Sequence, residues 1–149
     1  MLGFVVATHG ALSDGLIDAA KLIVGNVDNT VTVNLILGDD IDALNQKIAD
    51  SITQVDKDDG VIVFTDLFGA SPYNQSVLAI SKLPKAQQKK IYLLTGVSLP
   101  MFIEAVNQQM IDANIDDAVE NILNQANAGV TKWSSNDIAD VGASNDDDF

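Results

Sequence analysis

His9 is the residue on which the chemistry of this chain is expected to depend, because it is the only histidine among the 149 residues. The chain has no cysteine and no arginine. An unperturbed imidazole titrates near neutral pH, so it can serve there as a base or as a nucleophile for a phosphoryl group. His9 follows an apolar run directly and precedes Gly10, a residue that permits a turn. We therefore expect proton or phosphoryl chemistry to start at this ring.

A carboxylate and a serine follow another apolar run further along the chain. Asp66 comes after the run that begins at Gly60, and Ser71 stands before Pro72, a pair typical of a helix cap and a first helical residue. A carboxylate that accepts one imidazole N–H fixes the tautomer and leaves the other nitrogen available for attack. A helix N-terminus favours anions. If Asp66 faces His9, these residues predict a catalytic pair beside a phosphate site.

The phosphate would have to be held without a guanidinium group, because the chain has no arginine. Backbone N–H groups and hydroxyls are the remaining donors. Each feature also has an ordinary explanation, since His9 can be a surface residue, Asp66 can begin a turn and Ser71 can be only a helix cap. The combination of three such groups on adjacent loops favours a site. No metal and no cofactor is predicted. The predicted phosphate-binding residues are Ser71, Ala70, Gly69, Thr8 and Gly10.

These residues must be positioned by the elements that precede and follow them. Apolar runs predict strands, and apolar residues spaced three or four apart predict helices. Their alternation predicts a doubly wound α/β fold with a mainly parallel four-stranded sheet and helices on both faces. Ligands bind such sheets outside the carboxyl ends of the strands, where the strand order reverses. The site therefore requires the first and third strands to be neighbours. The predicted strands are 2–7, 31–37, 60–65 and 91–94, and the predicted helices include 12–24, 71–80, 99–110 and 115–128.

The end of the chain is predicted to differ from the rest. Residues 130–133 could form a short final strand, and residues 134–149 are polar and rich in aspartate. Such a composition is typical of a solvated, flexible tail. We therefore expect one domain over residues 1–133 and an acidic tail over residues 134–149. Between Lys85 and Lys90 we expect only a polar connection.

Composition excludes several classes of function. The net charge is -13, with eight lysines against 21 carboxylates, which argues against binding to nucleic acid. An acidic surface favours basic protein partners. No apolar run approaches the roughly 20 residues that span a bilayer, and the N-terminus lacks the features of a signal peptide. The absence of cysteine fits a reducing compartment. A cytoplasmic location is therefore expected.

Three motifs resemble the IIA component of the mannose-family sugar phosphotransferase system, which includes mannose, fructose and sorbose types. They occur in the order of that family and at the matching ends of the predicted elements, within roughly the first 130 residues. No single motif would be specific to the family, but the three motifs together, on a matching order of strands and helices, are specific. The motifs are Phe4–Gly10, Thr65–Asn74 and Thr95–Met101.

The resemblance implies a phosphocarrier. It implies that His9 takes a phosphoryl group from the carrier protein HPr and passes it to a IIB component, which phosphorylates an incoming sugar. It also implies that Asp66 orients the ring through Nδ1, that Nε2 carries the phosphate and that Ser71 lies beside it. Family members are homodimers that exchange a C-terminal strand, for which residues 130–133 are the candidate here. IIB is expected on a separate chain, with indirect association to membrane IIC and IID components.

Three other functions compete with this interpretation. A phosphocarrier subunit of a dihydroxyacetone kinase would keep the fold and the chemistry but change the pathway. A histidine phosphatase also places a nucleophilic histidine at a strand end, but its Arg-His-Gly motif needs an arginine that this chain lacks. A non-catalytic regulatory or dimerisation module would leave His9 without phosphate. Phosphorylation of His9 separates the last possibility from the others.

Overall fold

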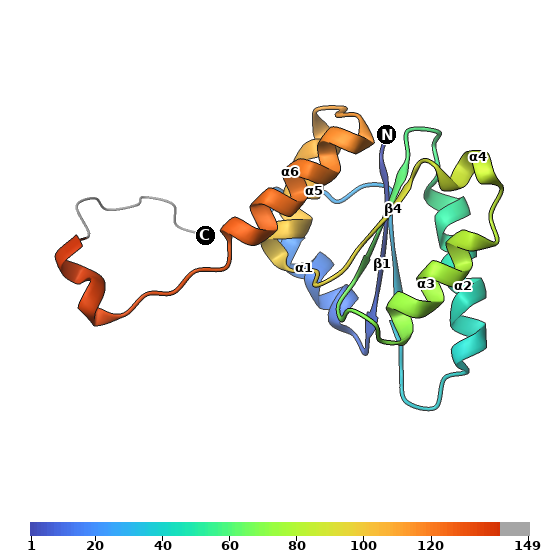
Figure 1. Cartoon of the computed structure of the whole chain (residues 1–149), viewed down its shortest axis with the longest axis horizontal. Helices are drawn as coiled ribbons and strands as arrows, with labels where there is room; N and C mark the ends of the chain where they lie inside the picture. The colour runs from blue at the N-terminus through green and yellow to red at the C-terminus, as the bar shows by residue number, and fades with distance from the viewer. Residues whose placement is uncertain (141–149) are drawn as a thin grey trace.

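The computed structural model describes residues 1–140, in which strands and helices alternate along the chain (Figure 1). The helices predicted over residues 12–24, 99–110 and 115–128 begin and end at those residues. In chain order the elements are β1 (Gly3–His9), α1 (Leu12–Val24), β2 (Thr30–Leu35), α2 (Ile41–Val55), β3 (Val61–Thr65), α3 (Ser71–Ser81), α4 (Lys85–Gln88), β4 (Ile91–Leu94), α5 (Leu99–Met110), α6 (Ile115–Ala128) and the 3₁₀ helix η1 (Ser135–Asp140).

The strands form one parallel sheet in the order β2-β1-β3-β4. The chain leaves β1 toward one edge of the sheet, and after α2 it crosses to the other side of β1 to enter β3. The strand order therefore reverses between β1 and β3, whose pairing places Ala7 opposite Thr65. This is the place where open α/β sheets bind ligands. The predicted fold class and the adjacency of the first and third strands are both confirmed.

Helices cover both faces of the sheet, which explains why β1 and β3 are nearly continuous apolar runs. On one face, α1, α5 and α6 enclose a core that contains Phe4, Phe64 and Phe102 (Figure 1). The centroids of these three rings lie 5.8–5.9 Å apart in edge-to-face contacts. On the other face, α2 and α3 pack over a second core that contains Val5 and Val63. The two cores fix β1 between layers and so fix the direction in which its last residue points.

The second strand is shorter than predicted. It ends at Leu35, whereas the apolar pattern continues through Ile36 and Leu37. Asp39 closes a turn at this point, because its carboxylate accepts from the N–H of Ile36 at 2.9 Å and its own N–H donates to the Ile36 carbonyl at 3.1 Å. Ile36 and Leu37 therefore lie exposed in the loop after β2.

Two segments in the second half of the chain also differ from the prediction. Residues 85–88 form the short helix α4 after Pro84, where only a connection was predicted. Residues 130–133 form no strand, and the chain there leads away from the sheet after α6 (Figure 1). A strand needs a sheet edge to pair with, and this segment pairs with neither edge strand, β2 or β4, of its own described chain. Ser135–Asp140 is a 3₁₀ helix inside the predicted tail, and residues 141–149 of that tail lie outside the described residues.

None of the helices within residues 1–140 combines the length and the apolar character that crossing a membrane requires.

Candidate active site

The candidate site lies at the carboxyl edge of the sheet, where β1 and β3 end side by side. His9 is the last residue of β1, and Asp66 follows the last residue of β3. Gly10 and Gly69 have φ values of +55° and +77°, a left-handed conformation that glycine adopts without steric cost. Gly10 lets the chain turn immediately after His9, and Gly69 lets it turn three residues after Asp66. The two predicted catalytic residues are thereby brought together from positions 57 apart in the sequence.

One carboxylate oxygen of Asp66 makes both contacts with His9. Oδ2 lies 2.9 Å from the ring Nδ1 and 3.0 Å from the backbone nitrogen, whose N–H donates to it. The side chain of Asp66 is 13% exposed, whereas that of His9 is 47% exposed. A neutral ring that donates from Nδ1 to the carboxylate has its unprotonated nitrogen at Nε2. One oxygen thus holds both the ring and the backbone of His9, and the second ring nitrogen is left available for chemistry.

The N-terminus of α3 lies in the same loop, but its cap differs from the prediction. Ala70 is the N-cap residue and Ser71 is the first helical residue, so Pro72 is one position further into the helix than expected. The prediction of Ser71 as the cap was therefore wrong by one residue. The reason is local, because Gly69 takes the left-handed turn and Ala70 is already extended. As the first helical residue, Ser71 presents both its N–H and its hydroxyl at the helix end, where N–H groups lack intrahelical partners.

Of the other residues in the loop, two have groups already in hydrogen bonds. The Ala70 N–H donates to the Leu67 carbonyl at 3.3 Å, and the Gly69 carbonyl accepts from the side-chain amide of Asn74 at 2.9 Å. Ser71 is consequently the predicted phosphate-binding residue in this loop with the most available donors. A phosphate contact of these three residues remains a prediction.

Thr8 and Gly10 shape the site from within the fold. Thr8 is fully buried, and its hydroxyl accepts from the N–H of Ser13 at 2.8 Å. The N–H of Gly10 donates to the carbonyl of Leu35 at 2.7 Å. The hydroxyl of Thr8 and the N–H of Gly10 are thus both used to fix the β1–α1 turn beside His9. Their predicted contact with phosphate stays untested, and the structure shows them as supports of the turn.

A polar network joins the start of α1 to β2 close to this turn. The carboxylate of Asp14 accepts from the Thr32 hydroxyl at 2.7 Å and from the Asn34 side chain at 2.6 Å. These two hydrogen bonds hold the pKa of Asp14 below its ordinary value. The hydroxyl of Ser13 also donates to the Asn34 side chain. The network secures the helix that begins three residues after His9.

Sequence reasoning missed an apolar rim around the site. Leu67 and Phe68 are 59% and 72% exposed in the loop between Asp66 and Gly69, and Phe68 packs edge-to-face on Tyr73. The signal was present in the sequence, because a loop that places two large apolar residues beside a functional carboxylate is unusual unless they contact a partner. We call the exposed apolar side chains at the start of α1 and in the loops after β2 and β3 the apolar rim: Leu12, Ile36, Leu37, Leu67 and Phe68.

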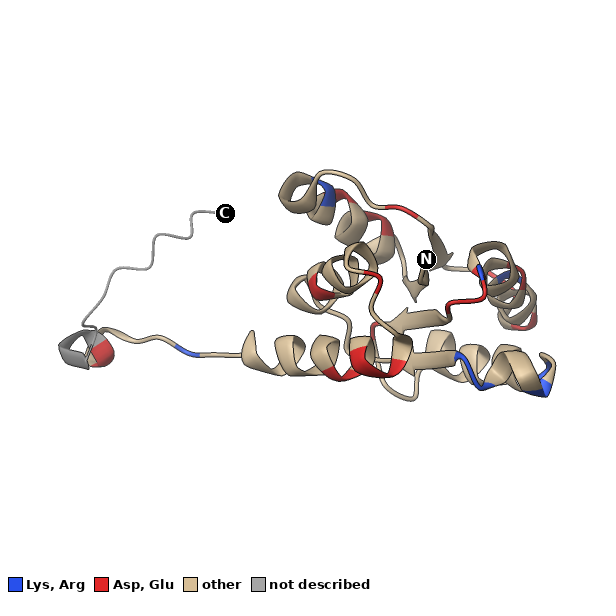
Figure 2. Cartoon of the chain, turned by 90° about the horizontal axis from the view of Figure 1, so that it is seen from above, with Lys and Arg blue, Asp and Glu red and all other residues tan. Residues whose placement is uncertain are grey.

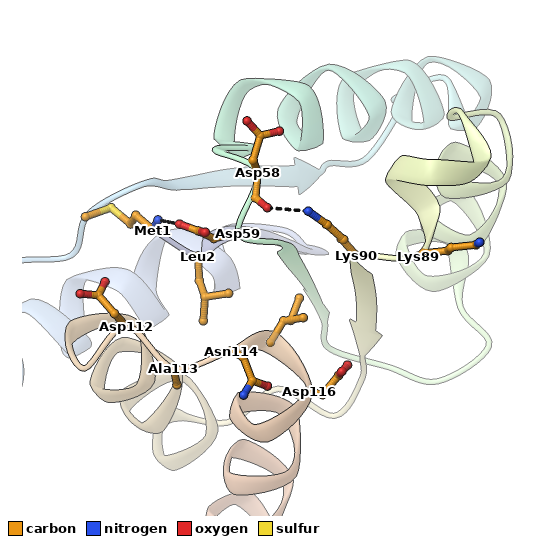
Figure 3. A pocket seen from close by; sticks show the side chains of 11 residues that line it. Met1, Leu2, Asp58, Asp59, Lys89, Lys90, Asp112, Ala113, Asn114 and Asp116 are labelled. Atoms are coloured by element: carbon orange, nitrogen blue, oxygen red, sulfur yellow. Dashed lines mark hydrogen bonds and ion pairs between the residues drawn. The ribbon is translucent and has the colours of Figure 1, made fainter.

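A cavity of about 630 Å³ lies elsewhere and includes none of the predicted site residues (Figure 3). Its wall includes Met1, Asp59, Lys90 and the start of α6. In Figure 3 the N-terminal amine forms an ion pair with Asp59, and the side chain of Lys90 donates a hydrogen bond to the Asp58 carbonyl at 3.0 Å. Within the described residues no group of three or more His, Asp or Glu side chains could hold a metal ion.

Comparison with known proteins gives a family for this arrangement. The family model described as "PTS system fructose IIA component", where PTS is the phosphotransferase system, matches residues 3–123. The chain belongs to this family. The match includes β1, β3 and the start of α3, so it covers the whole candidate site. This mannose-family IIA chain thus carries His9, Asp66 and Ser71 inside the region that defines the family.

Two curated relatives and one solved structure illustrate the likeness. The mannose-specific EIIAB component of Escherichia coli K12 is 24% identical over 129 residues, which cover 87% of this chain and 38% of the relative. The IIA chain therefore spans well under half of that protein. The fructose-specific EIIA component of Bacillus subtilis is 24% identical over 107 residues, covering 72% of this chain and 70% of the relative. A crystal structure of EIIA from Streptococcus agalactiae has a TM-score of 0.74 and 26% identity, with coverage of 89% and 97%.

Proposed function

We propose that this IIA chain is a cytoplasmic phosphocarrier in which His9 accepts a phosphoryl group from phosphorylated HPr and donates it to a IIB component. The observation that carries the proposal is the contact of Nδ1 with Asp66, which leaves Nε2 as the nucleophile on a ring that is 47% exposed. In the first step the Nε2 lone pair attacks phosphorus, and the P–N bond to the donor breaks with its electron pair staying on the donor ring. The second step repeats this chemistry toward IIB.

Asp66 has a defined part in both steps. Attack by Nε2 places positive charge on the His9 ring while Nδ1 keeps its proton. A carboxylate at 2.9 Å from Nδ1 stabilises that charge, as a carboxylate does for an imidazolium in other nucleophilic sites. The second contact of Oδ2, to the backbone N–H, holds the carboxylate in line with the ring. Orientation and charge stabilisation therefore come from the same oxygen.

Ser71 is proposed to bind the phosphoryl group from the start of α3. Its N–H and hydroxyl lie at a helix end, where the helix dipole favours an anion. No arginine is available to clamp the group, because the sequence contains none. Weak retention suits a carrier, since tight binding of the phosphorylated state would slow its release to the acceptor.

A protein donor and a protein acceptor both fit the surroundings of His9. The apolar rim offers contact area next to an exposed ring, and exposed apolar groups of this kind mark interaction surfaces. Acidic residues are spread over helices and loops of a chain with a net charge of -13 (Figure 2). Basic partner surfaces would be steered toward it. Because the matched relatives are named for sugar phosphotransfer, we favour IIB over a dihydroxyacetone kinase as the acceptor.

The assembly is proposed to be a homodimer in which residues 130–133 pair with the partner's sheet, associated indirectly with IIC and IID. The open edge strand β4 is available for such pairing. Light scattering of the full chain and of a chain ending at Gly129 tests this. We expect a dimer for the first and a monomer for the second.

The central experiment is intact-mass analysis after incubation with phosphoenolpyruvate, enzyme I and HPr. We expect an acid-labile gain of one phosphoryl group that is absent in His9→Ala. Addition of IIB and sugar should then remove the label from the wild type. An unlabelled wild type in a mixture where HPr is phosphorylated would refute the carrier function and favour a non-catalytic module.

A further inference from the structure

Asp66 uses only one of its two oxygens on His9. Its other oxygen, Oδ1, is buried and has no hydrogen-bond partner within the described part of the chain. The same is true of two threonine hydroxyls, Thr65 Oγ1 and Thr95 Oγ1. Buried polar atoms of a native protein nearly always have a partner. Three such atoms at the adjoining ends of β3 and β4 therefore require an explanation.

The topology places both threonines beside that carboxylate. Thr65 is the last residue of β3 and precedes Asp66 directly, and Thr95 follows the last residue of β4. Phe64 pairs with Leu94, so the next step along these parallel strands brings Thr65 beside Thr95. Paired residues of neighbouring strands lie on the same face of the sheet, which here is the face covered by α2 and α3.

The chemistry of the three atoms indicates how they are satisfied together. A carboxylate oxygen only accepts hydrogen bonds, whereas a hydroxyl both donates and accepts. A water molecule within reach of all three atoms would accept from the Thr65 hydroxyl and donate to both Asp66 Oδ1 and Thr95 Oγ1. Buried waters of this kind make about three hydrogen bonds to otherwise unsatisfied groups.

We propose that Thr65 and Thr95 are positioning residues whose hydroxyls hold a buried water against Oδ1 of Asp66 and so keep Oδ2 directed at His9. The inference deepens the proposed function, since it concerns the same carboxylate. It is tested on the imidazole itself, which reports the orientation of Asp66 without any phosphoryl donor. Because the chain has one histidine, ¹⁵N NMR of the ring nitrogens gives a single unambiguous set of signals.

The test compares Thr65→Val and Thr95→Val, which keep the side-chain shape and remove the hydroxyl, with Thr65→Ser and Thr95→Ser, which keep the hydroxyl. In the wild type we expect the neutral ring to carry its proton on Nδ1. Each valine variant should shift the tautomer ratio toward Nε2–H by about fivefold, the change that one hydrogen bond makes in an equilibrium. The serine variants should keep the wild-type ratio. Thr53→Val, on the exposed surface of α2, is the matched control and should leave the ratio unchanged.

The outcomes separate this inference from the proposed function. Wild-type tautomer ratios in both valine variants, with unchanged thermal unfolding, would overturn the inference. If the ratio shifts as expected but the wild type accepts no phosphate, the carrier function fails while the positioning role stands. If His9 is phosphorylated, the valine variants should also transfer the phosphoryl group more slowly, and the serine variants should transfer it at the wild-type rate. If Thr65→Val does not fold, Thr95→Val alone decides, because Thr95 lies in a loop beyond β4.

Discussion

Replacing Asp66 by alanine should slow phosphoryl transfer without abolishing it. The substitution removes the single oxygen that contacts Nδ1 at 2.9 Å and the backbone N–H at 3.0 Å. The nucleophilic nitrogen remains in place, but the ring loses its fixed tautomer and the charge that stabilises it during attack. Both directions of transfer, from HPr and to IIB, should be affected because both pass through the same charged ring.

The structure allows the size of this effect to be worked out. A hydrogen bond to a charged group contributes about 1.5–3 kcal/mol. The ring of His9 is 47% exposed, so water can take over part of the lost contact, which argues for the lower end of that range. A loss of about 1.5 kcal/mol in the transition state corresponds to a rate about tenfold lower. Asp66→Asn should lie between alanine and wild type, because it keeps an accepting oxygen without the charge.

The assay is rapid-quench transfer of labelled phosphate from phosphorylated HPr to the IIA chain, and from the labelled chain to IIB. Asp18→Ala is the matched control, since it removes one exposed carboxylate from α1 away from the site. Rates within about twofold of wild type in both directions for Asp66→Ala would remove Asp66 from the mechanism.

Three further substitutions test the core, the polar network and the apolar rim. Phe102→Ala should lower the free energy of unfolding by about 3–5 kcal/mol in urea titrations, because it removes a fully buried ring from a three-ring cluster. Hydrogen bonds from Thr32 and Asn34 depress the pKa of Asp14 in the folded state. The stabilisation of the fold by these two hydrogen bonds is therefore fully present above pH 3.8, the ordinary pKa of an aspartate, and is lost as the pH falls through the folded-state pKa of Asp14. Asp14→Asn should consequently reduce the fall in the urea midpoint of unfolding at acid pH. Phe68→Ala should raise the apparent KM for phosphorylated HPr about fivefold while the final extent of labelling stays unchanged.

Two of these substitutions have a matched variant in the same chain. Leu22→Ala removes a side chain that is 90% exposed on α1 and should leave the KM for HPr unaltered. Thr32→Val removes one of the two donors to Asp14 and should flatten the acid decline only in part. A Phe102→Ala variant that unfolds at the wild-type urea midpoint would contradict the assignment of that ring to the core.

The fold and the main pair of the site could be predicted because their signals are local. Apolar runs bounded by glycine and polar residues mark each strand, and their alternation with helices leaves few topologies. The approach of His9 to Asp66 then follows from strand order alone. The structure confirmed that order with Ala7 paired to Thr65.

What could not be predicted depends on backbone geometry at single residues. Serine before proline indicates a cap, yet the left-handed Gly69 moves the cap to Ala70. The Thr8 hydroxyl is buried under α1 because Thr8 lies on the face of β1 that this helix covers. The N–H of Ser13 near the start of α1 then donates to it. Residues 130–133 have the composition of a strand, but in the described chain they pair with neither edge strand of the sheet.

The separation of His9 and Asp66 has a consequence for how the protein matures. The partners of the site's central contact are 57 positions apart in the sequence, and α1, β2 and α2 lie between them. During synthesis the histidine leaves the ribosome long before its carboxylate, and the contact closes only when β3 enters the sheet beside β1. Long-range parallel pairing of this kind is a late and slow event in folding. The contact between the His9 ring and Asp66 is therefore a property of the finished sheet, and unfinished chains carry a histidine without its carboxylate partner.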